Sequence, residues 1–137
     1  MAQRRGFQEF EHTADWGIHV WAEDFPSLLC TAAEGMFILL EVEIEVTEQF
    51  PTTISLQVTG SKESLLVDFL NELLYLSERD KLSFVDCDLL LSENTLTGTL
   101  IGKKVIAQGK EIKAVTFHNL EIISTSDGYE TRIVFDV

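Results

Sequence analysis

Basic residues are scarce in this sequence. Ten lysines and arginines stand against 23 aspartates and glutamates, so the formal net charge is -13 at pH 7 and the isoelectric point is near 4.4. A surface this acidic repels nucleic-acid phosphates and anionic membranes, which argues against RNA or DNA binding by the surface as a whole. The charge suits a basic protein partner or bound cations, although solubility alone is the simpler interpretation.

Cysteines and long apolar runs are also few. Cys30 and Cys87 belong to no C-x-x-C pair and have no histidine at zinc-ligand spacing. Cys30 lies in an apolar helical stretch, so we predict a buried thiol, and nothing requires an oxidising compartment. No signal-peptide segment follows the N-terminal arginines, and no apolar run is long enough to cross a bilayer. The expected location is therefore the cytoplasm, with no membrane association.

Recognisable catalytic motifs are missing as well. There is no P-loop, dinucleotide-binding glycine motif or nucleophile elbow. His12, His19 and His118 are scattered, and isolated histidines are usually structural or solvated. A Ser/His/Asp or Cys/His triad is not excluded, because its members need not be neighbours in sequence. Asp68 and Glu72, one helical turn apart, could bind a metal, but like charges on a solvated helix face are the more ordinary interpretation.

What the sequence does contain is enough for one folded domain. Its 137 residues are 45% hydrophobic and 24% charged, which is typical of a globular protein with its own core. No low-complexity linker or charge block divides the chain. We therefore predict a single domain over residues 1–137.

Apolar periodicity predicts two helices. One follows Pro26, and Ser61 is a plausible N-cap for the other. The apolar stripe of the first consists of Phe25, Leu28, Leu29, Ala32, Ala33, Met36, Phe37 and Leu40. The stripe of the second consists of Leu65, Leu66, Phe69, Leu70, Leu73 and Leu74.

The remaining segments read as strands. Alternation predicts strands at 7–11, 18–22 and 53–59, and the acidic segment 41–48 could form a short edge strand. Two hairpins are expected, 84–91 with 95–101 and 114–125 with 129–137, the latter turning at Asp127-Gly128. A loop over 102–113 would hold four of the ten basic residues. The order predicts an α+β layered domain, a mainly antiparallel sheet with two helices packed on it.

The best candidate site combines a turn and the end of the sequence. Asp15 lies in a tight turn before a strand, and the last predicted strand ends at Asp136-Val137. If these two places are adjacent, two carboxylates and a main-chain or terminal oxygen of Val137 could bind a hard cation such as Ca²⁺ or Mg²⁺. Spacing alone gives weak support, because acidic residues at turns and chain ends are mostly solvated. Lys113, beside the basic loop, is either an exposed lysine or a charge that engages a phosphate or a partner carboxylate.

Five segments in order resemble the archease family. Phe10-Glu11-His12-Thr13-Ala14-Asp15 with Gly17 resembles its opening signature, and Ala32-Ala33-Glu34-Gly35-Met36-Phe37 its first helix. The segment from Leu66 to Leu76 resembles its second helix, Ile112 to His118 its late strand motif, and Ile133 to Val137 its terminal strand. The resemblance covers nearly the whole chain from Phe7, and the order of the motifs makes it specific.

The resemblance implies a function. Archeases are small α+β proteins that activate RtcB-type RNA ligases in tRNA splicing and RNA repair, promoting guanylylation and multiple turnover, and they bind a divalent cation, usually Ca²⁺. It implies that Asp15, Asp136 and Val137 form the metal site. It also implies that Lys113, with Asp15 and Asp136, activates the ligase, and that RNA is engaged only through the ligase. This family role is that of a cofactor, not an enzyme.

Two other functions remain open at this stage. A metal-dependent phosphoesterase or other small hydrolase would use Asp15, Asp136 and His118, but the sequence offers no nucleophile or base constellation for it. A general protein-binding chaperone would need exposed apolar patches, which the regular amphipathic helices do not indicate.

Overall fold

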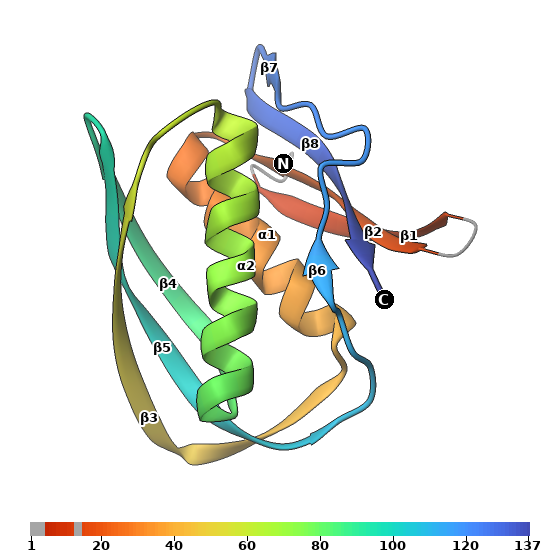
Figure 1. Ribbon diagram of the computed structural model, residues 1–137, viewed down its shortest axis with the longest axis vertical. Helices are drawn as coiled ribbons and strands as arrows, with labels where there is room; N and C mark the ends of the chain where they lie inside the picture. The colour runs from red at the N-terminus through yellow and green to blue at the C-terminus, as the bar shows by residue number, and fades with distance from the viewer. Residues whose placement is uncertain (1–4, 13–14) are drawn as a thin grey trace.

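The computed structural model describes residues 5–12 and 15–137, and the side chains of Glu11, His12 and Asp15 lie outside that description. Within this part of the chain, the strands and helices follow one another as Figure 1 shows. They are β1 (Gly6–His12), β2 (Asp15–Ala22), α1 (Phe25–Leu39), β3 (Val42–Gln57), α2 (Lys62–Asp80), β4 (Leu82–Ser92), β5 (Thr95–Gln108), β6 (Ala114–Val115), β7 (Ile123–Thr125) and β8 (Gly128–Asp136).

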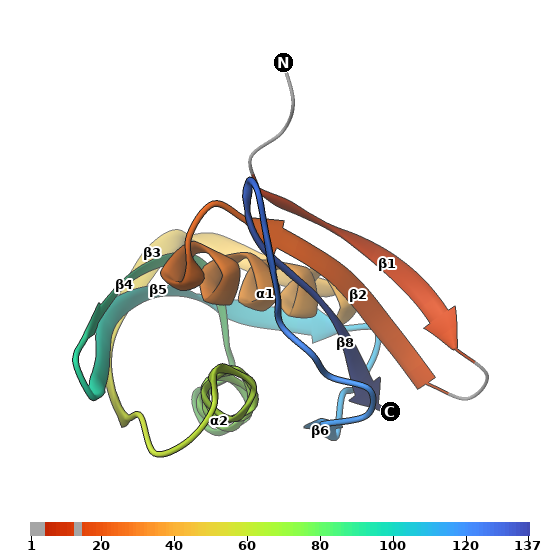
Figure 2. The same cartoon turned by 90° about the horizontal axis from the view of Figure 1, so that it is seen from above.

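The strands divide between two antiparallel sheets. The first has the order β1-β2-β8-β6, with β7 also paired to β8, and the second has the order β3-β5-β4. α1 packs against strands of both sheets and against α2, while α2 contacts β4 and β6. Figure 2 shows α2 in the hollow of the curved β3-β5-β4 sheet. The predicted fold class, two helices on antiparallel strands, is confirmed, with two sheets in place of one.

The helices begin where local chemistry favours a start. The Asp24 carboxylate accepts from the backbone N–H of Ser27 at 2.8 Å, with Pro26 in the first turn of α1. Ser61 caps α2 as expected, accepting from the N–H of Ser64 at 3.1 Å. Lys81 ends α2 in the left-handed conformation, with φ of 56°.

The core forms where the apolar stripes of both helices meet the inner faces of the sheets. Phe69, Leu28 and Leu73 from the helices and Phe135 and Ile133 from β8 are fully buried. Burial of such side chains contributes roughly 1.5–3 kcal/mol each relative to exposure. In the described part of the chain, neither helix is long and apolar enough to cross a membrane.

Gly35 shows why a glycine stands inside α1. A Cβ built there would lie 2.9 Å from Ile18 Cδ1 and 3.1 Å from the ring of Phe7. The glycine therefore lets α1 approach β1 and β2 closely, which outweighs its cost to the helix.

Several sequence-based boundaries were wrong. Residues 42–48 of the acidic segment belong to the edge strand β3, which continues to Gln57 and whose register shifts between Glu45 and Phe50. The expected loop over 102–113 is strand as far as Gln108. Lys103 Nζ donates to the carbonyl of Val46 at 2.8 Å and Lys104 lies over the Phe50 ring, so these lysines cover β3. The strand expected over 114–125 splits into β6 and β7 around residues 116–122.

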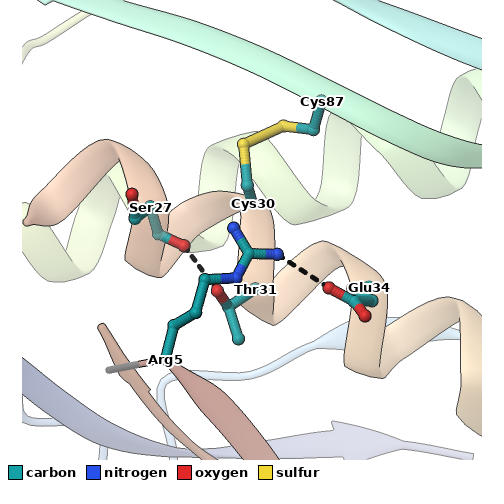
Figure 3. A network of polar contacts seen from close by, with 6 residues as sticks. All are labelled: Arg5, Ser27, Cys30, Thr31, Glu34 and Cys87. Carbon is teal, nitrogen blue, oxygen red and sulfur yellow. Dashed lines mark hydrogen bonds and ion pairs between the residues drawn. A yellow bond between two sulfur atoms is a disulfide. The ribbon is translucent and has the colours of Figure 1, made fainter. Parts of the chain in front are cut away.

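The prediction of a free thiol at Cys30 was also wrong. Cys30 of α1 is buried, but it forms a disulfide with Cys87 of β4, their Cα atoms 5.7 Å apart (Figure 3). The two cysteines are 57 positions apart in sequence, and only the packing of α1 on β4 brings them within disulfide range. An ion pair of 2.9 Å between Arg5 and Glu34 lies nearby in Figure 3.

Candidate functional site

The start of β2, the end of β8 and the short strand β6 lie side by side at one end of the first sheet (Figure 1). Phe135 of β8 is the register partner of Trp16 on one side and of Val115 on the other. Asp15 is the residue before Trp16, and Asp136 is the residue after Phe135. The main chains of the two aspartates therefore occupy neighbouring strands at the same end of the sheet.

The outer residues of this corner are open to solvent. Asp136 and Val137 are exposed, the latter by 38%, whereas Phe135 beneath them is fully buried. The Asp136 carboxylate is thus held at the rim of the core by a strand that cannot shift without exposing an aromatic ring. Val137 follows the last residue of β8, Asp136, so its main-chain oxygen lies one residue beyond the residue that carries this carboxylate.

Lys113 is attached to this corner through the main chain. Its N–H donates to the carbonyl oxygen of Asp136 at 2.7 Å, and its side chain is exposed. Two residues later, the N–H of Val115 donates to Oδ1 of Asn71 on α2 at 3.0 Å. The position of Lys113 is therefore fixed by β8 on one side and by α2 on the other.

A second cation, that of Lys110, lies at the same corner, beside Trp16. Lys110 Nζ is 3.4 Å from the centroid of the half-buried Trp16 ring and 3.0 Å from Oε2 of Glu41. The sequence placed Lys110 only within the expected loop over 102–113. No local pattern links residues so distant in the chain, so only the folded structure reveals this contact.

The donors at this corner are of one chemical kind. Asp136 contributes carboxylate oxygens and the chain around it contributes main-chain oxygens, which suit hard cations such as Ca²⁺ and not soft metals. Among residues whose side chains are described, no group of three or more histidines, cysteines or acidic residues could hold a metal ion. A site here therefore depends on Asp15, whose side chain lies outside the described residues. The predicted metal site of Asp15, Asp136 and Val137 therefore stays a prediction.

The other residues singled out by sequence lie away from one another. His118 is exposed on the turn after β6, with its Nε2 3.3 Å from Nδ2 of Asn119. Asp68 is exposed and Glu72 half-buried on α2. His12 has a described main chain, paired with Asp15 across the β1–β2 hairpin, but no described side chain.

Comparison with protein families gives a match over nearly the whole chain. The model of the archease protein family matches residues 7–137. Protein archease of Methanosarcina barkeri is 32% identical over 145 aligned positions, which cover 99% of each chain. Protein archease of Methanothermobacter thermautotrophicus is 30% identical, with 97% of this chain and 99% of the relative covered.

Solved structures share the fold. The solution structure of Methanobacterium thermoautotrophicum protein 1598 superposes with a TM-score of 0.71 at 28% identity, covering 96% of this chain and 99% of the other. The crystal structure of an archease from Thermotoga maritima, described as a possible chaperone, superposes with a TM-score of 0.68 at 23% identity. That alignment covers 95% of this chain and 96% of the other.

Proposed function

Because this chain belongs to the archease family, we propose that it is an accessory protein of an RtcB-type RNA ligase. In this role it promotes guanylylation of the ligase, sustains multiple turnover in tRNA splicing, and is not itself the catalyst. It acts in the cytoplasm and meets RNA only through the ligase. The relative from Thermotoga maritima, described as a possible chaperone, is in keeping with action on a protein partner.

The observation that carries the proposal is the convergence of three strands at one corner. The beginning of β2 and Lys113 flank the end of β8, and Lys113 is bonded to Asp136 through the main chain. Asp15 and Asp136 thus belong to adjacent strands, and Lys113 directly precedes β6 on the other side of β8. A partner surface could contact all of them at once, which scattered residues would not allow.

We further propose that a divalent cation binds at this corner, with Ca²⁺ as the first candidate. Asp15 and Asp136 would hold it with carboxylate oxygens and Val137 with a main-chain oxygen, which is the donor chemistry that Ca²⁺ prefers. When bound, the cation would supply a fixed positive charge at an otherwise acidic surface. The residues themselves would position that charge, together with the Lys113 ammonium, towards the nucleotide-binding region of the ligase.

The net charge of -13 supports a partner with basic surface. A ligase that binds RNA and nucleotide phosphates needs such a surface, so an acidic helper would be attracted to it and would not compete for the RNA itself. Docking of this kind predicts activation that weakens as the salt concentration rises.

The test is single-turnover guanylylation of the RtcB-type ligase from the same genome, with the wild-type protein, with Asp136→Ala and with Asp88→Ala. Asp88 is an exposed aspartate on β4 of the other sheet and serves as a matched control. We expect acceleration by the wild type and by the control, and none by Asp136→Ala.

Other outcomes have distinct meanings. Acceleration by all three proteins would retain the activator and remove Asp136 from its site. No acceleration by any of them would overturn the ligase proposal. Broad suppression of aggregation of unrelated proteins would then favour a general chaperone, and phosphoester turnover by the isolated protein would favour a metal-dependent hydrolase.

A further inference from the structure

A cavity lies between α2 and the end of β5, and it meets the corner formed by β2, β8 and β6 at Lys110 and Lys113. Its volume is about 710 Å³. One wall is formed by α2 from Asn71 to Glu78 with the C-cap residue Lys81, and the other by Val105 and residues 108–113. We call it the α2–β5 groove. Its size is in the range of sites that hold a ligand or a short peptide segment.

The floor of the α2–β5 groove includes a strand edge. β4 begins at Leu82, which pairs with Lys104, so β5 continues past the start of β4. The N–H of Val105 donates to the carbonyl of Lys81 at 2.9 Å. Beyond Val105, that side of β5 faces the groove. Ala107 and Gln108 pair with β3 on the opposite side. A strand with one neighbour offers main-chain donors and acceptors to an added strand.

The charge of the groove differs from that of the rest of the molecule. Its lining holds three lysines (Lys81, Lys110 and Lys113) and two glutamates (Glu78 and Glu111). The whole chain has 23 acidic and only 10 basic residues. Lys81 and Lys113 are exposed, whereas Lys110 is engaged by Glu41. Besides the Lys110–Glu41 pair, the lining holds two lysines and two glutamates, so a carboxylate on a ligand would not meet an acidic majority there.

The dimensions match a short extended chain. From Asn71 to Lys81 the wall of α2 spans about 15 Å, at about 1.5 Å per residue. An extended peptide rises about 3.3 Å per residue, so about five residues fill this length. Tyr75, exposed by 57%, lies along the wall with the Arg79 guanidinium carbon 5.5 Å from its ring centroid, so this part of the wall combines an aromatic ring and a cation.

We propose that the α2–β5 groove binds an extended, carboxylate-bearing peptide segment of a protein partner, which adds to the edge of β5 as a further strand. Main-chain hydrogen bonds to β5 supply sequence-independent affinity, and Lys81 selects for an acidic side chain. Binding of this segment needs neither Asp15 nor Asp136 and is measured without the ligase, although Lys113 belongs both to the groove and to the proposed activating residues.

The test uses a random library of 12-residue peptides displayed on phage and selected on the full-length protein. A selected peptide is synthesised and titrated into the ¹⁵N-labelled protein. We expect enriched peptides to carry aspartate or glutamate between apolar residues. We also expect their binding to shift the amide signals of residues 105–109 most strongly.

Variants make the test specific. Lys81→Asn removes the charge while suiting the left-handed backbone, and should weaken binding at least about threefold. Glu78→Gln removes an acidic residue from the same wall and should strengthen binding. Lys62→Asn, at the other end of α2, should change nothing. Failure to enrich any peptide, enrichment of basic peptides, signal shifts elsewhere, or equal affinity of Lys81→Asn would each overturn the proposal.

Discussion

The backbone N–H of Lys113 donates to the backbone carbonyl oxygen of Asp136 at 2.7 Å. This bond joins the residue before β6 to the last residue of β8. The adjacent bond from the N–H of Val115 to Oδ1 of Asn71 ties the same segment to α2. Packing of a helix therefore determines where the proposed activating lysine lies relative to the proposed metal ligand.

Replacement of Asn71 should loosen this segment. Asn71→Ala leaves the N–H of Val115 without its acceptor, so we expect a loss of about 1–2 kcal/mol in the free energy of unfolding, measured with urea. Hydrogen exchange at Val115 should become faster. Asn71→Asp keeps an acceptor and should retain most of the protection at Val115. Equal protection in wild type and Asn71→Ala would show that the bond does not hold the segment.

Reduction of the disulfide should destabilise the protein. Cys30 and Cys87 close a loop with a sequence separation of 57, for which the chain-entropy model gives about 4 kcal/mol. We expect a lower melting temperature in dithiothreitol than without it. The double variant Cys30→Ala/Cys87→Ala should melt at the same temperature with and without reductant. Two reactive thiols in the untreated, denatured wild type would contradict the assigned bond.

Glu63 should make stability depend on pH. The pKa of its carboxyl is lowered from 4.5, chiefly by the hydrogen bond of 2.8 Å from the backbone N–H of Ile122. A carboxyl with a lowered folded-state pKa stabilises the protein above its unfolded pKa and loses this contribution as pH falls through the folded pKa. After allowance for solvent screening, we expect Glu63→Gln to cost at most about 1 kcal/mol near pH 7.

The cost of Glu63→Gln should disappear as the pH falls through the lowered folded-state pKa of Glu63, because the wild-type carboxyl is then also protonated. Urea titrations of both proteins across this range measure the difference. Glu43→Gln, at an exposed position on β3, provides the matched control. A cost independent of pH would assign the role of Glu63 to packing and not to its charge.

Gly128 should tolerate no side chain. Its φ is 143°, and a Cβ there would lie 2.1 Å from the carbonyl oxygen of Ala22. Gly128→Ala is expected to cost about 2 kcal/mol or more, seen as a lower melting temperature. Gly60→Ala is the control, because its nearest contact would be 3.4 Å, at Ser64 Oγ. Similar melting temperatures of the two variants would contradict the assigned geometry.

Calcium should stabilise the wild-type protein if the proposed cation site exists. At a concentration about 100 times the dissociation constant, bound Ca²⁺ adds about 2.7 kcal/mol to the free energy of unfolding. The melting temperature should rise with Ca²⁺ and fall again with EGTA. Asp136→Asn should abolish the rise and Asp88→Asn should preserve it. An equal rise in Asp136→Asn would remove Asp136 from the site.

The local features of the fold were predictable because they depend on residues close in sequence. Apolar spacing predicted α1 and α2, Ser61 predicted the start of α2, and Asp127-Gly128 predicted the turn before β8. Each of these features depends on contacts between residues that are close together in sequence, so the order of the side chains determines it directly. The ordered motifs also predicted the archease family, which the family comparison confirmed.

The strand boundaries show where local information ends. Sequence alternation stopped β5 at Ile101, yet it continues to Gln108 because β3 runs beside it and lysines of β5 cover β3. Polar lysines favour a loop when considered alone. Pairing with a partner strand provides the hydrogen bonds that override this preference.

The order of the residues was enough to specify the two amphipathic helices, the hairpin turns, the acidic charge and the candidate residues Asp15, Asp136, Val137 and Lys113. The pairing of Cys30 with Cys87 and the contact between Lys110 and Trp16 arise only in the folded chain. Folding also sets the ends of β2 and β8 beside Lys113 and forms the α2–β5 groove. These relationships join residues far apart in the chain, and they follow from the packing of both sheets around α1, which no local pattern encodes.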